Sequence, residues 1–223
     1  MNTRTWGIGL AGLICSLTVQ ANTRDGFYLG AGIGASIDHY DLQASNLLNG
    51  YNLDMNTDQT NTLGNVFVGM GYTTEYSLFL GGELGTNFPS HSATLPGIAG
   101  ISSTYPLYKN TLQTKEYATL DVLPGYAFNP NILIYGRAGI GYAELTLKQP
   151  IIGTRHGFNI NENRWGGRVG VGANIALNNT FGIGLDYYYT QYQAMNIYSP
   201  VFNTQFKPEG NNNYFGLSVL YNI

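Results

Sequence analysis

The chain has 223 residues, of which 43% are hydrophobic and only 10% are charged, and its formal net charge is -3. This balance excludes a broad basic surface for nucleic acid and an acidic, solvating tail. Charge therefore indicates no nucleic-acid partner.

The N-terminal residues have the pattern of a secretory signal. A positively charged start is followed by a largely apolar run over residues 6–19, and Val19-Gln20-Ala21 has the spacing of a cleavage site. The run is shorter than the roughly 18 apolar residues that a membrane-spanning helix needs. We therefore predict a signal peptide over residues 1–21 and a mature domain over residues 22–223.

Beyond residue 21 the chain repeatedly alternates apolar residues with small or polar ones. In residues 26–36, apolar side chains share one side of a predicted strand, and glycines occupy most of the other side. The apolar side is Phe27, Leu29, Ala31, Ile33 and Ala35, and the other is Tyr28, Gly30, Gly32 and Gly34. Glycines and charges cannot fill the inside of a soluble barrel, so we expect the apolar side to contact lipid.

Eight such stretches predict eight strands, an even number as in single-chain bacterial membrane barrels. No later apolar run reaches the length of a spanning helix, so the backbone hydrogen bonds must close between strands. The predicted fold is an all-β, eight-stranded, antiparallel up-and-down transmembrane β-barrel. Its strands are expected at residues 26–36, 63–72, 77–88, 115–126, 132–145, 164–177, 181–191 and 213–223.

The connections between these strands alternate in length, as in outer-membrane barrels, whose short turns face the periplasm. Turns rich in Asn, Pro and Thr are expected at residues 73–76, 127–131 and 178–180. Long polar loops are expected on the opposite rim, at residues 37–62, 89–114, 146–163 and 192–212.

Charged residues on the inward side of five consecutive strands predict a structural network in the lumen. They are Glu83, Asp121, Arg137, Arg168 and Asp186. The interior of an eight-stranded barrel is just wide enough for side chains, so these charges must neutralise one another. We expect Arg137 to pair with Asp121 and Glu83, and Arg168 to pair with Asp186. Glu116 and Glu144 have the outward parity and lie at the long-loop ends of their strands.

Aromatic residues with the outward parity gather at the two ends of the apolar band, where amphipathic rings favour headgroup depth. Those at the short-turn rim are Phe27, Tyr72, Tyr126, Phe181 and Tyr221. Those at the long-loop rim are Phe88, Tyr142, Trp165, Tyr187, Tyr189 and Phe215. The pattern predicts two interfacial girdles.

Other motifs give little support for catalysis. The three histidines, His39, His91 and His156, fall in separate loops and share no metal-ligand spacing. Ser90-His91-Ser92 would suit a serine hydrolase, but no acidic residue in that segment orients the imidazole. We therefore predict no catalytic residue, no metal site and no cofactor.

Three motifs, taken in order together with the loop alternation, resemble a known family. They are Phe27-Tyr28-Leu29-Gly30 with Gly34, Gly82-Glu83-Leu84-Gly85, and Arg137-Ala-Gly-Ile-Gly-Tyr142. They look like the eight-stranded outer-membrane barrels related to the transmembrane domain of outer membrane protein A and to opacity surface proteins. The last strand resembles the C-terminal signal that the barrel assembly machinery reads, carried here by Tyr221 and Ile223.

The resemblance and the residue pattern imply a protein of the bacterial outer membrane, exported through its signal peptide and then inserted. The expected partners are outer-membrane lipids, lipopolysaccharide, the barrel assembly machinery, and host or environmental ligands at the loops. The expected role is structural or surface interaction, like that of an adhesin or antigen, and not enzymatic. Two alternatives remain open: an outer-leaflet lipid-modifying enzyme such as a lipid A deacylase, and a small gated pore.

Overall fold

The structure is a computed structural model that describes residues 24–46, 50, 52–88, 91–95, 110–149, 158–199 and 204–223. The signal peptide predicted over residues 1–21 lies outside the described residues. In the part of the chain that is described, no helix has the length and apolar character needed to cross a membrane.

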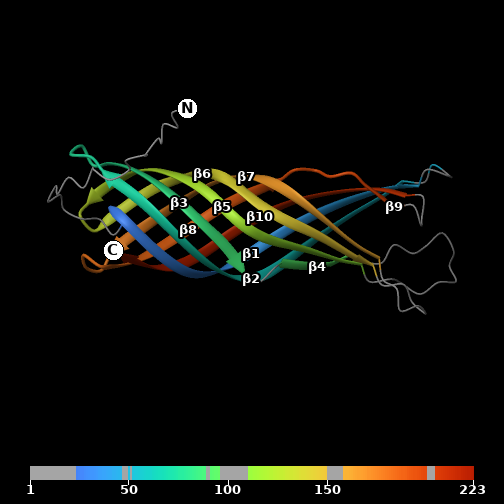
Figure 1. Ribbon diagram of the computed structural model, residues 1–223, viewed down its shortest axis with the longest axis horizontal. Coiled ribbons are helices and arrows are strands. Elements are labelled where there is room, and N and C mark those ends of the chain that lie inside the picture. Colours follow the sequence, from blue (N-terminus) through green and yellow to red (C-terminus); the bar gives the residue numbers. More distant parts are fainter. Residues whose placement is uncertain are drawn as a thin grey trace, which may run out of the picture.

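Eight long antiparallel strands form a closed barrel, which confirms the predicted fold (Figure 1). Each strand pairs with its neighbours in the chain, and β1 pairs with β10 to close the cylinder. The eight are β1 (Gly26–Asn46), β2 (Asn52–Thr73), β3 (Leu78–Phe88), β5 (Asn110–Asn129), β6 (Ile132–Gln149), β7 (Phe158–Ala176), β8 (Phe181–Tyr192) and β10 (Thr204–Asn222). Two short strands, β4 (His91–Leu95) and β9 (Ile197–Ser199), pair with β5 and β10 respectively.

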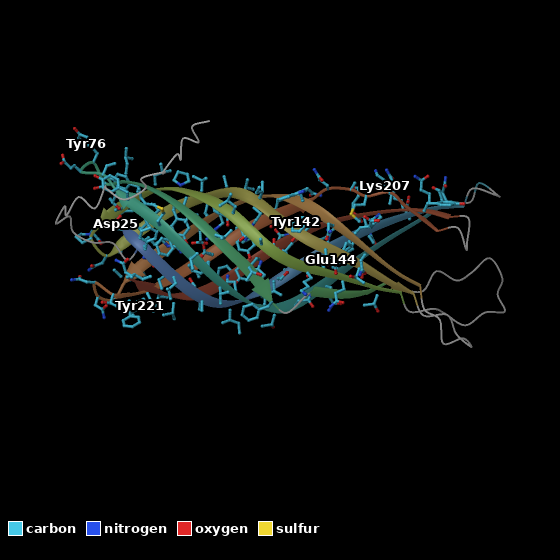
Figure 2. All side chains as sticks on the ribbon, in the orientation of Figure 1. Asp25, Tyr76, Tyr142, Glu144, Lys207 and Tyr221 are labelled. Atoms are coloured by element: carbon cyan, nitrogen blue, oxygen red, sulfur yellow. The ribbon has the colours of Figure 1, made fainter. Side chains whose placement is uncertain are left out.

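Side chains alternate between the lumen and the outer surface along each strand, because successive residues of a strand point to opposite faces. In β8, Ile183 and Leu185 are exposed on the outside, whereas Asp186 and Tyr188 are buried inside. The exposed hydrophobic side chains surround the barrel as a band, visible as sticks on its outside (Figure 2).

The three short turns lie where the sequence predicts them, and side chains of Asn and Thr stabilise them. The amide of Asn131 donates to the side-chain oxygen of Asn129 at 2.9 Å, and the amide of Thr180 donates to that of Asn178 at 2.9 Å. Between β2 and β3, Ser77 has a φ of 63°, and the amide of Leu78 donates to the side-chain hydroxyl of Thr74 at 3.2 Å. These are the short-range bonds by which Asn and Thr favour reversals.

At the opposite end the strands are much longer than predicted. The sequence predicts a loop over residues 37–62, but β1 and β2 remain paired as far as Ser45 and Asn52. The other long hairpins extend in the same way, so β5 starts at Asn110 and β10 at Thr204. Outside lipid the outer face no longer needs apolar side chains, so the alternation disappears although the backbone ladder continues.

The lumen also contains more apolar side chains than the alternation suggests. At the short-turn end, Phe79, Leu123, Leu133 and Tyr135 form one buried cluster. Tyr28, Phe67 and Leu220 form a second. The lumen glycines make room for these large inward side chains, so this part of the barrel has a small core of its own.

Candidate functional site in the barrel lumen

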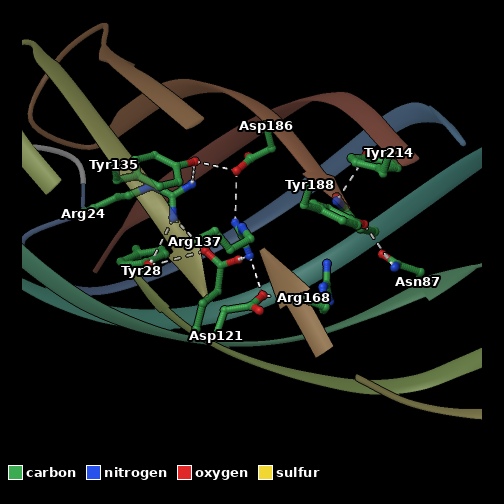
Figure 3. A network of polar contacts seen from close by, with 12 residues as sticks. Arg24, Tyr28, Asn87, Asp121, Tyr135, Arg137, Arg168, Asp186, Tyr188 and Tyr214 are labelled. Atoms are coloured by element: carbon green, nitrogen blue, oxygen red, sulfur yellow. Dashed lines mark hydrogen bonds and ion pairs between the residues drawn. The ribbon is translucent and has the colours of Figure 1, made fainter. Parts of the chain in front are cut away.

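Arg137 on β6 is the centre of a buried ion network in the middle of the lumen (Figure 3). Its Nη1 lies 2.7 Å from Oε1 of Glu83 and 2.6 Å from Oδ2 of Asp121, and its Nη2 lies 3.0 Å from Oδ1 of Asp186. The sequence predicts the first two contacts but not the third. Arginine can serve three carboxylates because its guanidinium offers five donors in a planar fork.

Arg24, which the sequence analysis did not single out, completes this network from the short-turn side. Its Nη1 donates to Oε2 of Glu83 at 2.6 Å and its Nη2 donates to the hydroxyl of Tyr135 at 3.0 Å. The Arg24 side chain is fully buried, and its guanidinium carbon lies 5.1 Å from the ring centre of Tyr28. Arg24 precedes the first strand, so strand parity gives no indication of where its side chain points.

Gly26 explains how Arg24 enters the lumen. Gly26 has a φ of 80°, a conformation that only glycine adopts readily, and there the chain turns from the barrel wall towards the inside. The neighbouring Asp25 accepts a hydrogen bond from the hydroxyl of Thr73 at 2.7 Å, which fixes the segment to β2.

Arg168 does not pair with Asp186, which the sequence analysis expected. Its Nη1 lies 3.8 Å from Oδ2 of Asp121 and 3.9 Å from Oε1 of Glu116, and its guanidinium stacks 4.0 Å from the ring centre of Tyr188. Asp186 instead binds Arg137 and accepts a hydrogen bond from Tyr135 at 2.7 Å. Pairs across a barrel depend on its tilt and register, which parity alone does not reveal.

Glu116 points into the lumen, and the expectation that it faces outwards is wrong. A β-bulge shifts the register of β5 against β6 between Glu116 and Ala118, and one extra residue reverses the side on which Glu116 lies. Glu116 is buried and accepts hydrogen bonds from the side chains of Asn87 and Tyr192. Glu144, beyond the bulge on β6, is only partly buried.

Above the ion network, further polar and aromatic side chains fill the lumen. The rings of Tyr188 and Tyr214 stack with centres 4.6 Å apart. Nearer the long-hairpin end, the Tyr40 hydroxyl hydrogen-bonds Thr114 at 3.0 Å. Burial, reinforced by the charge of Asp38, raises the pKa of the Tyr40 hydroxyl above its usual range, so this group is uncharged at neutral pH.

The space left beside the network is very small. A cavity of about 10 Å³ is lined by Arg137, Arg168, Asp186 and Tyr188, among others. A volume of this size holds about one water molecule at most. At this depth side chains fill most of the lumen beside the network.

The eleven predicted interfacial aromatics all lie on the outer side of the wall, and several contact one another. Phe181 and Tyr221 have ring centres 5.4 Å apart at the short-turn rim, and Tyr142 and Trp165 have ring centres 4.9 Å apart at the other (Figure 2 labels Tyr142 and Tyr221). The sequence analysis missed Phe128, which packs against Tyr126 at 5.3 Å.

The two residues of the predicted assembly signal lie where the barrel closes. Tyr221 pairs with Leu29 of β1 and with Phe181 of β8. The amide of Ile223 donates to the carbonyl of Phe27 at 2.9 Å, and the Ile223 side chain is exposed on the outside. Their recognition by the assembly machinery stays a prediction.

The two histidines in the described residues, His39 and His91, belong to strand segments that supply none of the charged residues of the ion network. His39, on the outer face of β1, lies 2.5 Å from Asp58 on β2, and His91 is part of β4. Ser90 and His156 lie outside the described residues. Within the described ranges, no three His, Cys, Asp or Glu side chains are grouped so as to hold a metal ion.

Comparison with solved structures finds similar proteins at low sequence identity, and the two with a TM-score above 0.5 share the barrel fold. The outer membrane protein OprG from Pseudomonas aeruginosa is 16% identical with a TM-score of 0.56, and the match covers 92% of this chain and 100% of that one. The outer membrane protease OmpT from Escherichia coli is 10% identical with a TM-score of 0.56, covering 90% and 98%. Ail, the attachment invasion locus protein of Yersinia pestis, is 13% identical with a TM-score of 0.38, covering 83% and 98%.

A family model settles the classification. No curated protein sequence matches the chain, but the model described as "Outer membrane protein beta-barrel domain" matches residues 8–222, nearly the whole sequence. The closed antiparallel barrel and its exposed apolar band agree with this match. The chain therefore belongs to the family of outer membrane protein β-barrel domains, and it is a protein of the bacterial outer membrane.

Proposed function

We propose that this barrel is a non-enzymatic surface protein whose long hairpins form a rigid structure for contact with ligands outside the cell. The observation that carries the proposal is the continuation of paired strands beyond the outer aromatic girdle. From Ala35, opposite the girdle residue Phe215, β1 stays paired with both of its neighbours as far as Ser45. Ten residues of strand correspond to a path of roughly 30 Å.

Beyond Ile37 the described outer-face side chains of β1 are polar, unlike the lipid-facing band below them. Asp41 on β1 and Asp58 on β2 are exposed there, and His39 is half-buried. Lys207 and Glu209 on β10 form an ion pair of 2.8 Å next to them. A paired sheet with such a face is suited to water, and it presents fixed side chains where a flexible loop would present mobile ones.

Surface display of a shortened variant tests the proposal. Residues 38–59 are replaced by an Asn-Gly turn that joins Ile37 to Thr60, which are already cross-strand partners. Cells of a non-adherent strain that display the full chain should bind host-cell or abiotic surfaces, and cells that display the shortened barrel should not. Equal adhesion of the two strains, with both barrels folded, contradicts the proposal.

The two alternative functions have their own tests. A gated pore predicts solute-dependent conductance in planar bilayers, whereas the cavity of about 10 Å³ at the network supports a silent bilayer. A lipid A deacylase predicts the loss of one acyl chain in lipid A mass spectra from cells that express the protein. The proposal predicts unchanged spectra.

A further inference from the structure

Arg164 on β7 is a fourth buried arginine among the described residues, and it lies outside the central ion network. It is 2% exposed, and it directly precedes the girdle residue Trp165, so it lies at the depth of the outer girdle. Its Nη2 donates to the hydroxyl of Thr114 on β5 at 2.9 Å, and its guanidinium carbon lies 4.3 Å from the ring centre of Tyr192 on β8. The guanidinium therefore lies inside the lumen between these strands.

Unlike the other three arginines, Arg164 forms no ion pair with any residue that the structure describes. Its Nε and Nη1 atoms are buried and have no hydrogen-bond partner, although together they carry most of the N–H groups of the guanidinium. The charges of Asp38 and Glu116 act on it only from beyond ion-pair distance. A buried charge with most of its donors unused is costly unless another group supplies the missing bonds.

The two carboxylates are already bound by other groups. Asp38 accepts a hydrogen bond from the side-chain amide of Asn61 at 2.8 Å. Oε1 of Glu116 lies 3.9 Å from Nη1 of Arg168. Moving either carboxylate to Arg164 would remove it from these partners, so the free donors of Arg164 remain open to a group from outside the chain.

Gly210 on β10 borders the unused donors. A Cβ added at Gly210 would lie 3.4 Å from Nη1 of Arg164 and 3.3 Å from the ring of Tyr40. The Tyr40 hydroxyl is uncharged at neutral pH and hydrogen-bonds Thr114 at 3.0 Å. A guanidinium and a neutral hydroxyl are both groups that donate hydrogen bonds to an anion.

The surroundings favour a planar anion with a single charge. One guanidinium balances one negative charge, and a dianion would add a second one in the neighbourhood of Asp38. The two oxygens of a carboxylate match the fork of N–H groups that arginine presents, whereas a spherical halide does not use this geometry.

We propose that Arg164 binds the carboxylate of a small ligand that enters the lumen from the long-hairpin end. Because Nε and Nη1 are buried, the Tyr40 ring turns aside to admit the ligand, which then lies beside Gly210 and accepts hydrogen bonds from Arg164. This site goes beyond the proposed surface contact and does not depend on it.

Side-chain NMR of the protein in nanodiscs tests the site directly. Sodium acetate, and separately sodium phosphate, replaces sodium chloride at constant ionic strength, and the Nε–H signal of Arg164 is followed. Acetate should shift this signal to saturation, because a bound carboxylate supplies the missing charge-assisted hydrogen bonds. The Nε–H signal of Arg168 should not move, since Glu116 and Asp121 already lie 3.9 and 3.8 Å from its guanidinium.

Two glycine variants test the position of the ligand without removing the arginine. Gly210→Ala places a methyl group beside Nη1 of Arg164 and should weaken acetate binding about fivefold or more, because an added group in a packed site must displace its neighbours. The matched control, Gly167→Ala on β7, adds the same methyl group where nothing lies within 4 Å and should leave acetate binding unchanged.

Unfolding in urea gives a second, independent readout. Acetate should raise the urea midpoint of the unchanged protein, because a ligand that binds only the folded state stabilises it. The midpoint of Arg164→Gln should not respond to acetate, since this variant lacks the guanidinium.

Each outcome decides the proposal. No saturable shift with acetate, an equal shift at Arg168, or equal acetate binding by Gly210→Ala and Gly167→Ala overturns the site. Saturation by phosphate at a lower concentration than acetate overturns the assignment of a carboxylate. If Arg164→Gln does not fold, the two glycine variants still decide, and the adhesion of displaying cells bears only on the proposed function.

Discussion

In the central ion network of the lumen, each buried charge lies close to a charge of opposite sign. Arg24, Arg137 and Arg168 lie among the carboxylates of Glu83, Glu116, Asp121 and Asp186. Taking a charge out of water is costly, and the cost is offset only when partners and hydrogen bonds surround it. We therefore interpret the network as a structural element that gives the barrel a single, stable interior.

Removal of the central arginine should destabilise the barrel strongly. Arg137→Ala leaves three buried carboxylates without their shared partner, and we expect a loss of about 3–5 kcal/mol in the free energy of unfolding. Urea unfolding in lipid vesicles measures this. The control is Lys207→Ala, which breaks the exposed pair with Glu209 and should cost less than about 1 kcal/mol. Equal, small losses in both variants would argue against the structural role.

The contact between Arg24 and Glu83 should appear as a coupling energy. Both side chains belong to one network, so the effects of Arg24→Ala and Glu83→Gln should not add. We expect a coupling of about 1–3 kcal/mol in a double-mutant cycle measured by the same unfolding assay. Additive effects would place the Arg24 side chain outside the network in solution.

At the scale of elements, the sequence predicts the strands correctly within the lipid layer, where the outer face must be apolar. Beyond the lipid layer no such requirement exists, and the strand ends were predicted incorrectly. The strands between the two girdles and the three short turns follow from alternation and turn residues, and the structure confirms them. The extension of β1 beyond Ser36 and the start of β2 before Leu63 were missed, because in water no apolar face is required. Glu116 was misplaced because a one-residue bulge has no clear signal in the sequence.

The sequence predicted only part of the ion network in the lumen, because strand parity shows which side chains face inwards but not which of them meet. Parity along a strand places Arg137, Glu83 and Asp121 in the lumen, and their separation by one or two strands makes contact between them a reasonable prediction. The partner of Arg168 depends on depth along tilted strands, which requires the register of the whole barrel. The role of Arg24 depends on a turn at Gly26 outside any strand.

A lumen-facing glycine on β6 provides a test of how closely the strands pack. A Cβ added at Gly139 would overlap the main-chain carbonyl of Leu120, whereas one added at Gly167 on β7 would meet nothing within 4 Å. We expect Gly139→Ala to cost about 1–3 kcal/mol, because the backbone must move. Gly167→Ala should be close to neutral in the same unfolding assay. A neutral Gly139→Ala would mean that β5 and β6 lie further apart.

Along its axis the whole molecule has three parts with different physical roles. The short-turn end holds small apolar clusters in the lumen, the middle holds the ion network, and the far end continues as paired hairpins above the outer girdle. Only the first two parts carry an apolar band on the outside. The central claim is therefore that the same strands pass from lipid into water without losing their pairing.

Spin labels along the outer face of β2 test this claim most directly. The only cysteine, Cys15, lies in the predicted signal peptide, so single cysteines at Met70, Val66, Thr62, Thr60 and Asp58 can be labelled without interference. In vesicles, labels at Met70 and Val66 should be accessible to oxygen dissolved in lipid, and labels at Thr60 and Asp58 should be accessible to a water-soluble nickel complex while remaining immobilised. Water accessibility at Met70 and Val66, or rapid unrestricted motion at Thr60 and Asp58, would contradict the account.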